Sequence, residues 1–124
     1  MIAVIFEVVP AEGQRDRYLD LAGGMRALAE GHDGFVSVER FQSLTDPSKL
    51  LSISFWRDEE ALDRWRRLER HRAMQSKGRE ELFAGYRLRV AHVLRDYGME
   101  AREEAPADSR AVLEGVPGGS ADPA

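Results

Sequence analysis

The spacing of apolar residues predicts the first half of the fold. Residues 2–9 are rich in β-branched side chains and stop at a proline, which has no N–H for a sheet ladder, so they predict a strand. Residues 14–30 repeat apolar positions at intervals of three and four, which predicts an amphipathic helix. Residues 35–41 and 50–56 alternate, and the turn-forming residues 45–48 between them predict a hairpin.

The second half of the pattern repeats a helix and a strand. Asp58 is a predicted helix N-cap, and the two glutamates after it suit the positive end of the helix dipole. Trp65 belongs to the apolar stripe of this helix and is expected in the core. Gly78 predicts a break, after which residues 79–84 form a short helical piece and residues 86–97 a long fourth strand.

The order strand, helix, strand, strand, helix, strand predicts an α+β fold. It indicates a ferredoxin-like βαββαβ sandwich, in which an antiparallel sheet carries both helices on one face. This domain is expected to occupy residues 1–97. Residues 98–124 are dominated by Ala, Glu, Pro, Gly and Ser and can bury little apolar surface, so they predict an acidic C-terminal tail.

Charge and composition exclude several classes of function. The net charge of −4 lies in the tail, because residues 1–97 hold 16 basic and 16 acidic side chains, whereas residues 98–124 hold 2 basic and 6 acidic ones. A neutral domain without a basic patch argues against nucleic-acid binding. No apolar run approaches the roughly 20 residues that span a bilayer, and no secretory leader is visible. The chain has no cysteine, which is compatible with a reducing compartment, so a cytoplasmic protein without a membrane partner is expected.

The sheet face away from the helices is expected to line a cavity. Its expected members combine small polar groups with large aromatic rings, a mixture typical of neither a solvated face nor a plain core. They are Phe35, Ser37, Glu39 and Phe41 in one strand, and Leu50, Ser52, Ser54 and Trp56 in the next. A partner sheet over this face would leave a partly lined cavity.

Glu7 is the first candidate for chemistry, because a carboxylate in a central strand must be paired or face a wet cavity. Arg87, Arg89 and His92 in the fourth strand are its expected partners. A structural ion pair and a ligand-contacting or proton-handling carboxylate are both consistent with this position. His92 is likewise either a structural side chain or a catalyst.

Other candidates concern substrate binding. Trp56 either seals the sheet edge or stacks on a flat aromatic substrate, and Phe41 and Glu39 belong to the same expected cavity wall. His71 and Gln75 share a helix face and are candidates for contacts with substrate, with the helix break or with a partner subunit. No Asp, Glu or Cys lies near them at ligand spacing, so no metal site is expected.

The segment from Ser52 to Gln75 carries a recognisable combination of motifs. A strand ends in Phe-Trp, a helix begins with the pattern E-A-x-x-x-W, and His-Arg-x-x-Gln follows. In these motifs the chain resembles the antibiotic biosynthesis monooxygenase domain family over about residues 1–97. The resemblance implies a homodimer, a dimeric α+β barrel in which two sheets face each other, with the isologous symmetry common among small oligomers. It also implies oxidation of a small aromatic or quinol substrate by O2 without a cofactor.

The resemblance assigns roles to the candidates. Glu7 and His92 would handle protons, Arg89 would stabilise a phenolate or oxyanion, and Trp56 and Phe41 would stack on the substrate ring. The rival hypothesis is a non-catalytic or stress-related dimer that holds a small apolar ligand.

Haem degradation ranks last among the hypotheses. Haem-degrading relatives use an asparagine at the end of the first strand and a histidine ten residues after the tryptophan. This chain has no asparagine, and it has Phe6-Glu7 and Gln75 at those places.

Overall fold

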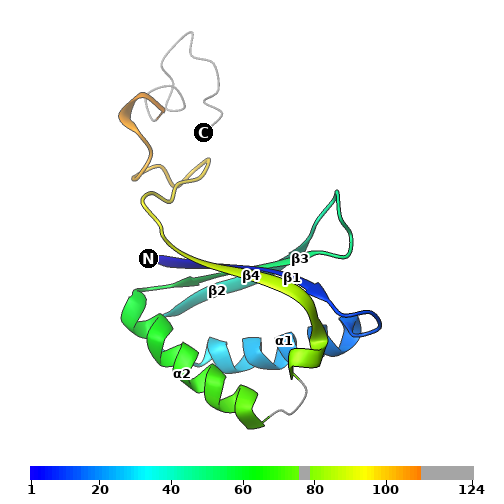
Figure 1. The fold of residues 1–124 in the computed structure, drawn as a ribbon. Helices are drawn as coiled ribbons and strands as arrows, with labels where there is room; N and C mark the ends of the chain where they lie inside the picture. Colours follow the sequence, from blue (N-terminus) through cyan, green and yellow to red (C-terminus); the bar gives the residue numbers. More distant parts are fainter. Residues whose placement is uncertain (76–78, 110–124) are drawn as a thin grey trace. The chain divides into compact units, whose positions relative to one another are not determined.

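The computed structural model describes residues 1–75 and 79–109, with the side chains of residues 70–80 excluded. The chain divides into two compact units, Met1–His92 and Val93–Ala124. The elements of the first unit follow the predicted order (Figure 1): β1 (Ile2–Pro10), α1 (Arg15–Glu30), β2 (Phe35–Gln42), β3 (Leu50–Trp56), α2 (Glu59–Gln75), the short 3-10 helix η1 (Arg79–Leu82) and β4 (Phe83–His92).

The four strands form one antiparallel sheet in the order β2-β3-β1-β4. Figure 1 shows α1 and α2 side by side under the same face of this sheet. The arrangement confirms the ferredoxin-like α+β fold. β1 lies inside the sheet, between β3 and β4. Its side chains alternate between the two faces of the sheet.

The N-terminus of α2 is fixed by the predicted cap. The backbone N–H of Ala61 donates to Asp58 Oδ1 at 2.8 Å, which satisfies one of the free donors of the first helical turn. Arg57, the residue before the cap, binds Asp33 with both terminal nitrogens at 3.1 and 3.2 Å, and its N–H donates to the carbonyl of Gly34 at 2.8 Å. These bonds tie the start of α2 to the start of β2.

Gly34 is required where these two elements meet. Its φ of 88° lies in the left-handed region, where a side chain is strained. A Cβ at this position would also overlap the Cβ of Ala61, which is fully buried in α2. The close approach therefore needs the smallest residue on one side and a small residue on the other.

The core between sheet and helices consists of two clusters. Ile2 and Trp56 lead the first cluster, at one end of the central strands, together with Ala29 and Trp65. Val8 and Leu50 lead the second, at the other end of the same strands, with Tyr18 and Ala22. Between these ends, β1 and β3 carry Val4, Phe6, Ser52 and Ser54 toward the helices.

The sequence prediction of the two sheet faces is wrong in β3. Leu50, Ser52, Ser54 and Trp56 pair with Val8, Phe6, Val4 and Ile2, so they face the helices. We call the opposite side the helix-free face; it carries Ala3, Ile5, Glu7, Ser37, Glu39, Phe41, Leu51, Ile53, Phe55, Arg87, Arg89 and Ala91. Both alternating sets of β3 contain large apolar residues, so alternation alone could not orient the strand.

An irregularity in β2 explains a second error of orientation. Phe35 pairs with Trp56, but the next paired residue is Ser37, opposite Phe55. The extra residue, Val36, reverses the alternation, as a β-bulge does. Phe35 therefore faces the helices, whereas Ser37, Glu39 and Phe41 lie on the helix-free face. The sequence had placed all four on one side.

The fourth strand differs from its prediction at both ends, because β4 begins at Phe83 and ends at His92. The first compact unit ends at the same residue. In the second unit, Arg102 donates to the Gly98 carbonyl at 3.0 Å and to Ser109 Oγ at 2.8 Å, and its guanidinium lies 5.1 Å from the Tyr97 ring centroid. Residues 110–124 of the predicted tail lie outside the described residues.

Candidate functional site

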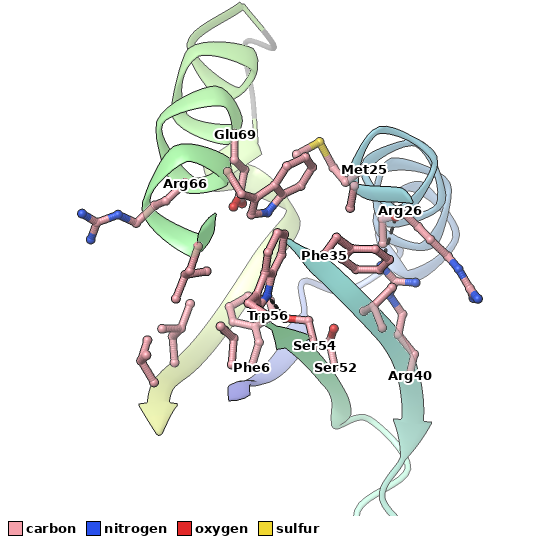
Figure 2. Close-up of a pocket in the computed structure, with 18 of the residues that line it drawn as sticks. Phe6, Met25, Arg26, Phe35, Arg40, Ser52, Ser54, Trp56, Arg66 and Glu69 are labelled. Atoms are coloured by element: carbon pink, nitrogen blue, oxygen red, sulfur yellow. Dashed lines mark hydrogen bonds between the residues drawn. The ribbon is translucent and has the colours of Figure 1, made fainter. Parts of the chain in front are cut away.

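A cavity of about 950 Å³ lies between the sheet and the two helices. Its size and mostly apolar wall are typical of small-molecule sites, which combine apolar walls with a few polar groups. Figure 2 shows side chains from the sheet and from both helices converging on it. The wall consists of Val4, Phe6, Tyr18, Leu21, Ala22, Met25, Arg26, Ala29, Phe35, Val38, Arg40, Ser52, Ser54, Trp56, Glu59, Glu60, Leu62, Asp63, Trp65, Arg66, Glu69, Phe83, Tyr86, Leu88 and Val90.

The strand register arranges the floor of the cavity in two rows across the sheet. One row contains Arg40, Ser52, Phe6 and Leu88, in the order β2, β3, β1, β4. The neighbouring row contains Val38, Ser54, Val4 and Val90 in the same order. Each row therefore begins at the β2 edge, has a serine at β3 and becomes apolar toward β4.

Two tryptophans close one end of the cavity. Trp56, which is 2 % exposed, stacks on Trp65 of α2 with ring centroids 5.7 Å apart and an angle of 28° between the planes. The indole N–H of Trp56 donates to Ser54 Oγ at 3.0 Å. His32 contacts both rings edge-on, at centroid distances of 6.1 and 5.7 Å. The stack is thus fixed by one hydrogen bond and by the packing of His32 from the loop between α1 and β2.

A second aromatic group forms the other end. Phe6 contacts Phe83 and Tyr86, with ring centroids 6.0 and 5.6 Å apart, and Tyr18 of α1 contacts Phe83 at 5.8 Å. Tyr86 lies in the edge strand β4 and is 66 % exposed. A flat apolar molecule could therefore contact aromatic surface at both ends of the cavity.

Arg40 supplies a cationic group to this wall. Its Nη2 donates to the carbonyl of Ala22, in the middle of α1, at 3.0 Å. Its Nε is buried and has no hydrogen-bond partner among the described residues. In Figure 2, Arg40 extends from β2 toward α1, whereas Arg26 and Arg66 extend away from the cavity.

The mouth of the cavity carries charged side chains of α2 and α1, several of which are paired. Asp63 binds Arg66 and Arg67 at 2.9 Å each, and Arg26 binds Glu30 at 3.2 Å. These exposed pairs contribute little to stability.

Two carboxyl groups near the start of α2 have shifted pKa values. The hydrogen bonds from Arg57 lower the pKa of Asp33, and the backbone N–H of Ala61 lowers the pKa of Asp58. Both groups are therefore ionised in the folded protein over a wider pH range than free carboxyl groups.

The structure does not gather the predicted site residues in one place. Glu7 Oε2 lies 3.4 Å from Arg89 Nη1 on the helix-free face, as one sequence alternative predicted. Glu39 and Phe41 also lie on that face, in β2. His92 is the last residue of β4 and pairs with Ile2, whereas Trp56 is buried at the cavity. The expectation that these residues share one cavity is therefore wrong, because the sheet separates them.

His71 lies in α2, but its side chain is outside the described residues. Sequence reasoning missed Arg40 as a cavity residue. An arginine alternating with Val38 in a strand was the available signal, but the bulge had to be known before its face could be assigned. Among the described residues, no three His, Asp or Glu side chains group as metal ligands do.

The family model for antibiotic biosynthesis monooxygenases matches residues 1–77. This match covers most of the first unit, including β1, both cavity strands of the hairpin and both helices. The chain belongs to the antibiotic biosynthesis monooxygenase family. The family assignment supports the expectation of an oxidoreductase of the monooxygenase type.

This chain is similar to two curated proteins, and it covers a different share of each. It is 45% identical over 93 residues to the jasmonate monooxygenase ABM of Pyricularia oryzae, a match that covers 75% of this chain but only 43% of the relative. It is 33% identical over 91 residues to the uncharacterized protein YqjZ of Bacillus subtilis, covering 73% of this chain and 77% of the relative. The chain thus spans less than half of the first relative.

Solved structures of low sequence identity share the fold. A mutant of SnoaB of Streptomyces nogalater, described as a cofactor-independent oxygenase, aligns with a TM-score of 0.62 at 12% identity, over 77% of this chain and 94% of that one. A putative antibiotic biosynthesis monooxygenase from Nitrosomonas europaea aligns with a TM-score of 0.64 at 9% identity, over 76% of this chain and 99% of that one.

None of the described helices is both long enough and apolar enough to cross a membrane.

Proposed function

We propose that this chain is a cofactor-independent monooxygenase that oxidises a small, largely apolar aromatic or quinol substrate in the cavity between sheet and helices. In the simplest balanced reaction, a CH2 group next to an ionised phenol-type ring becomes a carbonyl. One atom of O2 enters the carbonyl, the other leaves as water with the two hydrogens, and the substrate supplies all the electrons. Such a reaction needs a site that excludes water and stabilises the substrate anion.

The cavity is the observation that carries this proposal. Its volume of about 950 Å³ accommodates a molecule of several rings, and its wall is mostly aliphatic and aromatic. Polar groups of the sheet are confined to a few positions, Arg40, Ser52 and Ser54 among them. One of these, Ser54, is already occupied by the Trp56 indole. A substrate would thus be held by apolar contact and oriented by few hydrogen bonds.

Family relatives extend the range of substrates to be tested. The Pyricularia oryzae relative is named a jasmonate monooxygenase, which adds a small non-aromatic acid to the aromatic candidates. Hydroxylation of such a substrate consumes two electrons that the substrate does not supply, so it requires an external reductant. We therefore propose the quinol-type reaction as primary and include jasmonate, with and without a nicotinamide reductant, in the panel.

The roles proposed for Glu7, Arg89 and His92 need a different site from this cavity, because none of the three lines it. The separation of 3.4 Å between Glu7 and Arg89 favours the structural ion pair that the sequence left open. We propose that the pair stabilises the helix-free face, and that substrate binding depends on the cavity residues instead.

We also propose that the chain forms a homodimer through the helix-free face. This face carries Ile5, Leu51, Ile53 and Phe55 in its two central strands and Phe41, which is 45 % exposed, at its edge. An apolar patch of this kind in the centre of a face favours coverage by a partner, and a second copy satisfies it with the isologous symmetry most common among small oligomers.

Oxygen uptake tests the proposal directly. Purified protein is given naphthols, anthrones and hydroquinones, and jasmonate with and without a nicotinamide reductant, all without flavin or metal, and uptake is compared with the autoxidation blank. The cavity variant Ser52→Leu fills the space beside Phe6 and is expected to abolish uptake. Ser37→Leu places the same side chain on the opposite face of the sheet and is expected to leave uptake unchanged.

Uptake above the blank that falls only in Ser52→Leu supports the proposal. No uptake across the panel with the folded protein would overturn it, and binding of the same compounds without uptake would identify the non-catalytic ligand-binding alternative.

A further inference from the structure

We propose that Arg40, with the hydroxyl group of Ser52 beside it, binds an anionic oxygen of the substrate, so that the cavity selects small apolar molecules that carry one carboxylate or phenolate group. The inference rests on the proposed use of this cavity but not on the oxidation itself.

The hydrogen bonding of Arg40 leaves donors unused. A guanidinium group has five N–H donors, and the Ala22 carbonyl accepts one of them at 3.0 Å. The Nε atom is buried and has no partner among the described residues. Burying such a donor without a partner costs free energy, and buried polar groups are normally satisfied. Because Nε is closed off by the surrounding protein atoms, a ligand oxygen would bind the remaining N–H groups of the terminal nitrogens.

A structural role explains the arginine incompletely. Ala22 lies in the middle of α1, eight residues before the last residue of the helix at Glu30. Its carbonyl therefore belongs to the part of a helix where i to i+4 bonds already satisfy the backbone, and it needs no cap. Packing alone would also be served by an apolar side chain, as at Val38 in the same strand.

The charge of Arg40 is not neutralised by the protein. No carboxylate lies within ion-pair distance of it in the described part of the chain. Two of the acids that line the cavity have partners of their own, with Glu60 bound to Arg64 at 3.2 Å and Asp63 to Arg66 at 2.9 Å. Arg40 is partly buried, so its charge is screened less than that of a fully exposed arginine, and without an acid partner it can attract an anion.

The position of Ser52 adds a second donor. Ser52 lies directly opposite Arg40 in the antiparallel pairing of β2 and β3, where side chains on one face lie about 5 Å apart at Cβ. Both residues line the cavity, and from them the row continues through Phe6 to Leu88. An anionic group at the β2 edge would thus place an apolar body across the aromatic floor toward β4.

Calorimetric titration with matched probes tests the inference without any oxidation. We expect 2-naphthoate to bind about 10- to 100-fold more tightly than its methyl ester, which has the same rings but no charge. Arg40→Met retains an apolar stem and should remove this preference. Arg67→Met removes an exposed arginine of α2 that does not line the cavity and should keep the preference.

Two further arms separate the sources of the anion and protect the test from misfolding. Titration of 2-naphthol at rising pH reports a phenolate preference, whereas 2-naphthoate reports a carboxylate preference. Equal binding of acid, ester and naphthol by the wild-type protein at every pH would overturn the inference without any variant. A preference that survives in folded Arg40→Met would overturn it as well.

The outcome is independent of oxygen uptake. A preference for the acid without oxygen uptake would support the anion site and overturn the proposed oxidation. Oxygen uptake without a preference for the acid would support the oxidation and overturn the anion site.

Discussion

Trp56 donates its indole N–H to the hydroxyl oxygen of Ser54, two residues earlier in β3, at 3.0 Å. Both side chains point to the same face of the sheet, and Trp56 is 2 % exposed. The bond therefore satisfies the one polar atom of a buried ring and fixes that ring at the end of the cavity.

Replacing Ser54 with alanine should destabilise the fold. The buried indole N–H would lose its partner, which costs about 1–3 kcal/mol. Urea unfolding followed by tryptophan fluorescence measures the change. Ser52→Ala, in the same strand and on the same face, removes a hydroxyl group that is not bonded to Trp56 and should change stability by no more than about 0.5 kcal/mol. Equal effects of the two substitutions would contradict the assigned role of the bond.

Gly34 should tolerate substitution less well than Gly13. Both glycines have positive φ, 88° and 76°, so alanine is strained at either position. Only at Gly34 does an added Cβ overlap another atom, the Cβ of Ala61. Thermal unfolding of Gly34→Ala and Gly13→Ala measures the difference, and we expect the lower Tm for Gly34→Ala. Adding Ala61→Gly should recover part of the loss, and an equal Tm for the two single variants would refute the steric argument.

The acid side of the stability profile should depend on Asp33 and Asp58. Both folded-state pKa values lie below the usual value of 3.8, so protons bind the unfolded chain first. The stabilisation is complete above about pH 5 and is lost as the pH falls through the lower folded-state values. Chemical unfolding between about pH 6 and pH 2 is the measurement.

Asparagine substitutions provide the control for this acid dependence. Asp58→Asn keeps a residue that caps helices well but does not titrate, and Asp33→Asn removes the charge that binds Arg57. The double variant should lose less stability on acidification than the wild type. A profile with the same slope would show that other carboxyl groups determine it.

The helix-free face should control assembly. Ile53→Asp places a charge in the centre of that face, opposite Ile5 of β1, and should convert a dimer to a monomer in light-scattering measurements. Leu44→Asp puts the same charge on a residue that is 99 % exposed in the turn between β2 and β3 and should leave the dimer intact. A monomeric wild-type protein, or a dimeric and folded Ile53→Asp, would exclude this interface.

Glu7→Gln distinguishes the two uses of that face. If Glu7 only pairs with Arg89, the substitution should lower stability slightly and leave oxygen uptake unchanged, since neither residue lines the cavity. Loss of uptake in a folded dimeric Glu7→Gln protein would support the catalytic role that the sequence suggested for this carboxylate.

The sequence predicted the elements and their order well, because apolar spacing, the Asp58 cap and the turn at residues 45–48 are local signals. It failed on the direction in which side chains point. Trp56 was expected on the sheet face away from the helices, but it lies on the face that packs against them. Two causes combined, since both alternating sets of β3 are partly apolar and Val36 inserts a bulge into β2. Neither pairing register nor bulges can be read from one strand alone.

Arg40 was missed for the same reason, because its face depends on the bulge. Arg89 was one of three candidate partners that the sequence indicated for Glu7, because this topology places β4 beside β1, and a structural ion pair was one of the two alternatives left open. The sequence was thus a better guide to which strands neighbour each other than to the face of the sheet on which a side chain lies.

The strand register has a practical consequence for engineering. Even-numbered positions of β1 and β3, of β2 after its bulge and of β4 from Gly85 onward line the cavity or pack against the helices, whereas odd-numbered positions of these segments lie on the helix-free face. A combinatorial library restricted to Val38, Ser52, Ser54, Leu88 and Val90 would change the proposed substrate cavity without changing the helix-free face, through which we propose that the chain dimerises. On these proposals, selectivity and assembly are separate traits of this sheet, each open to directed evolution without the other.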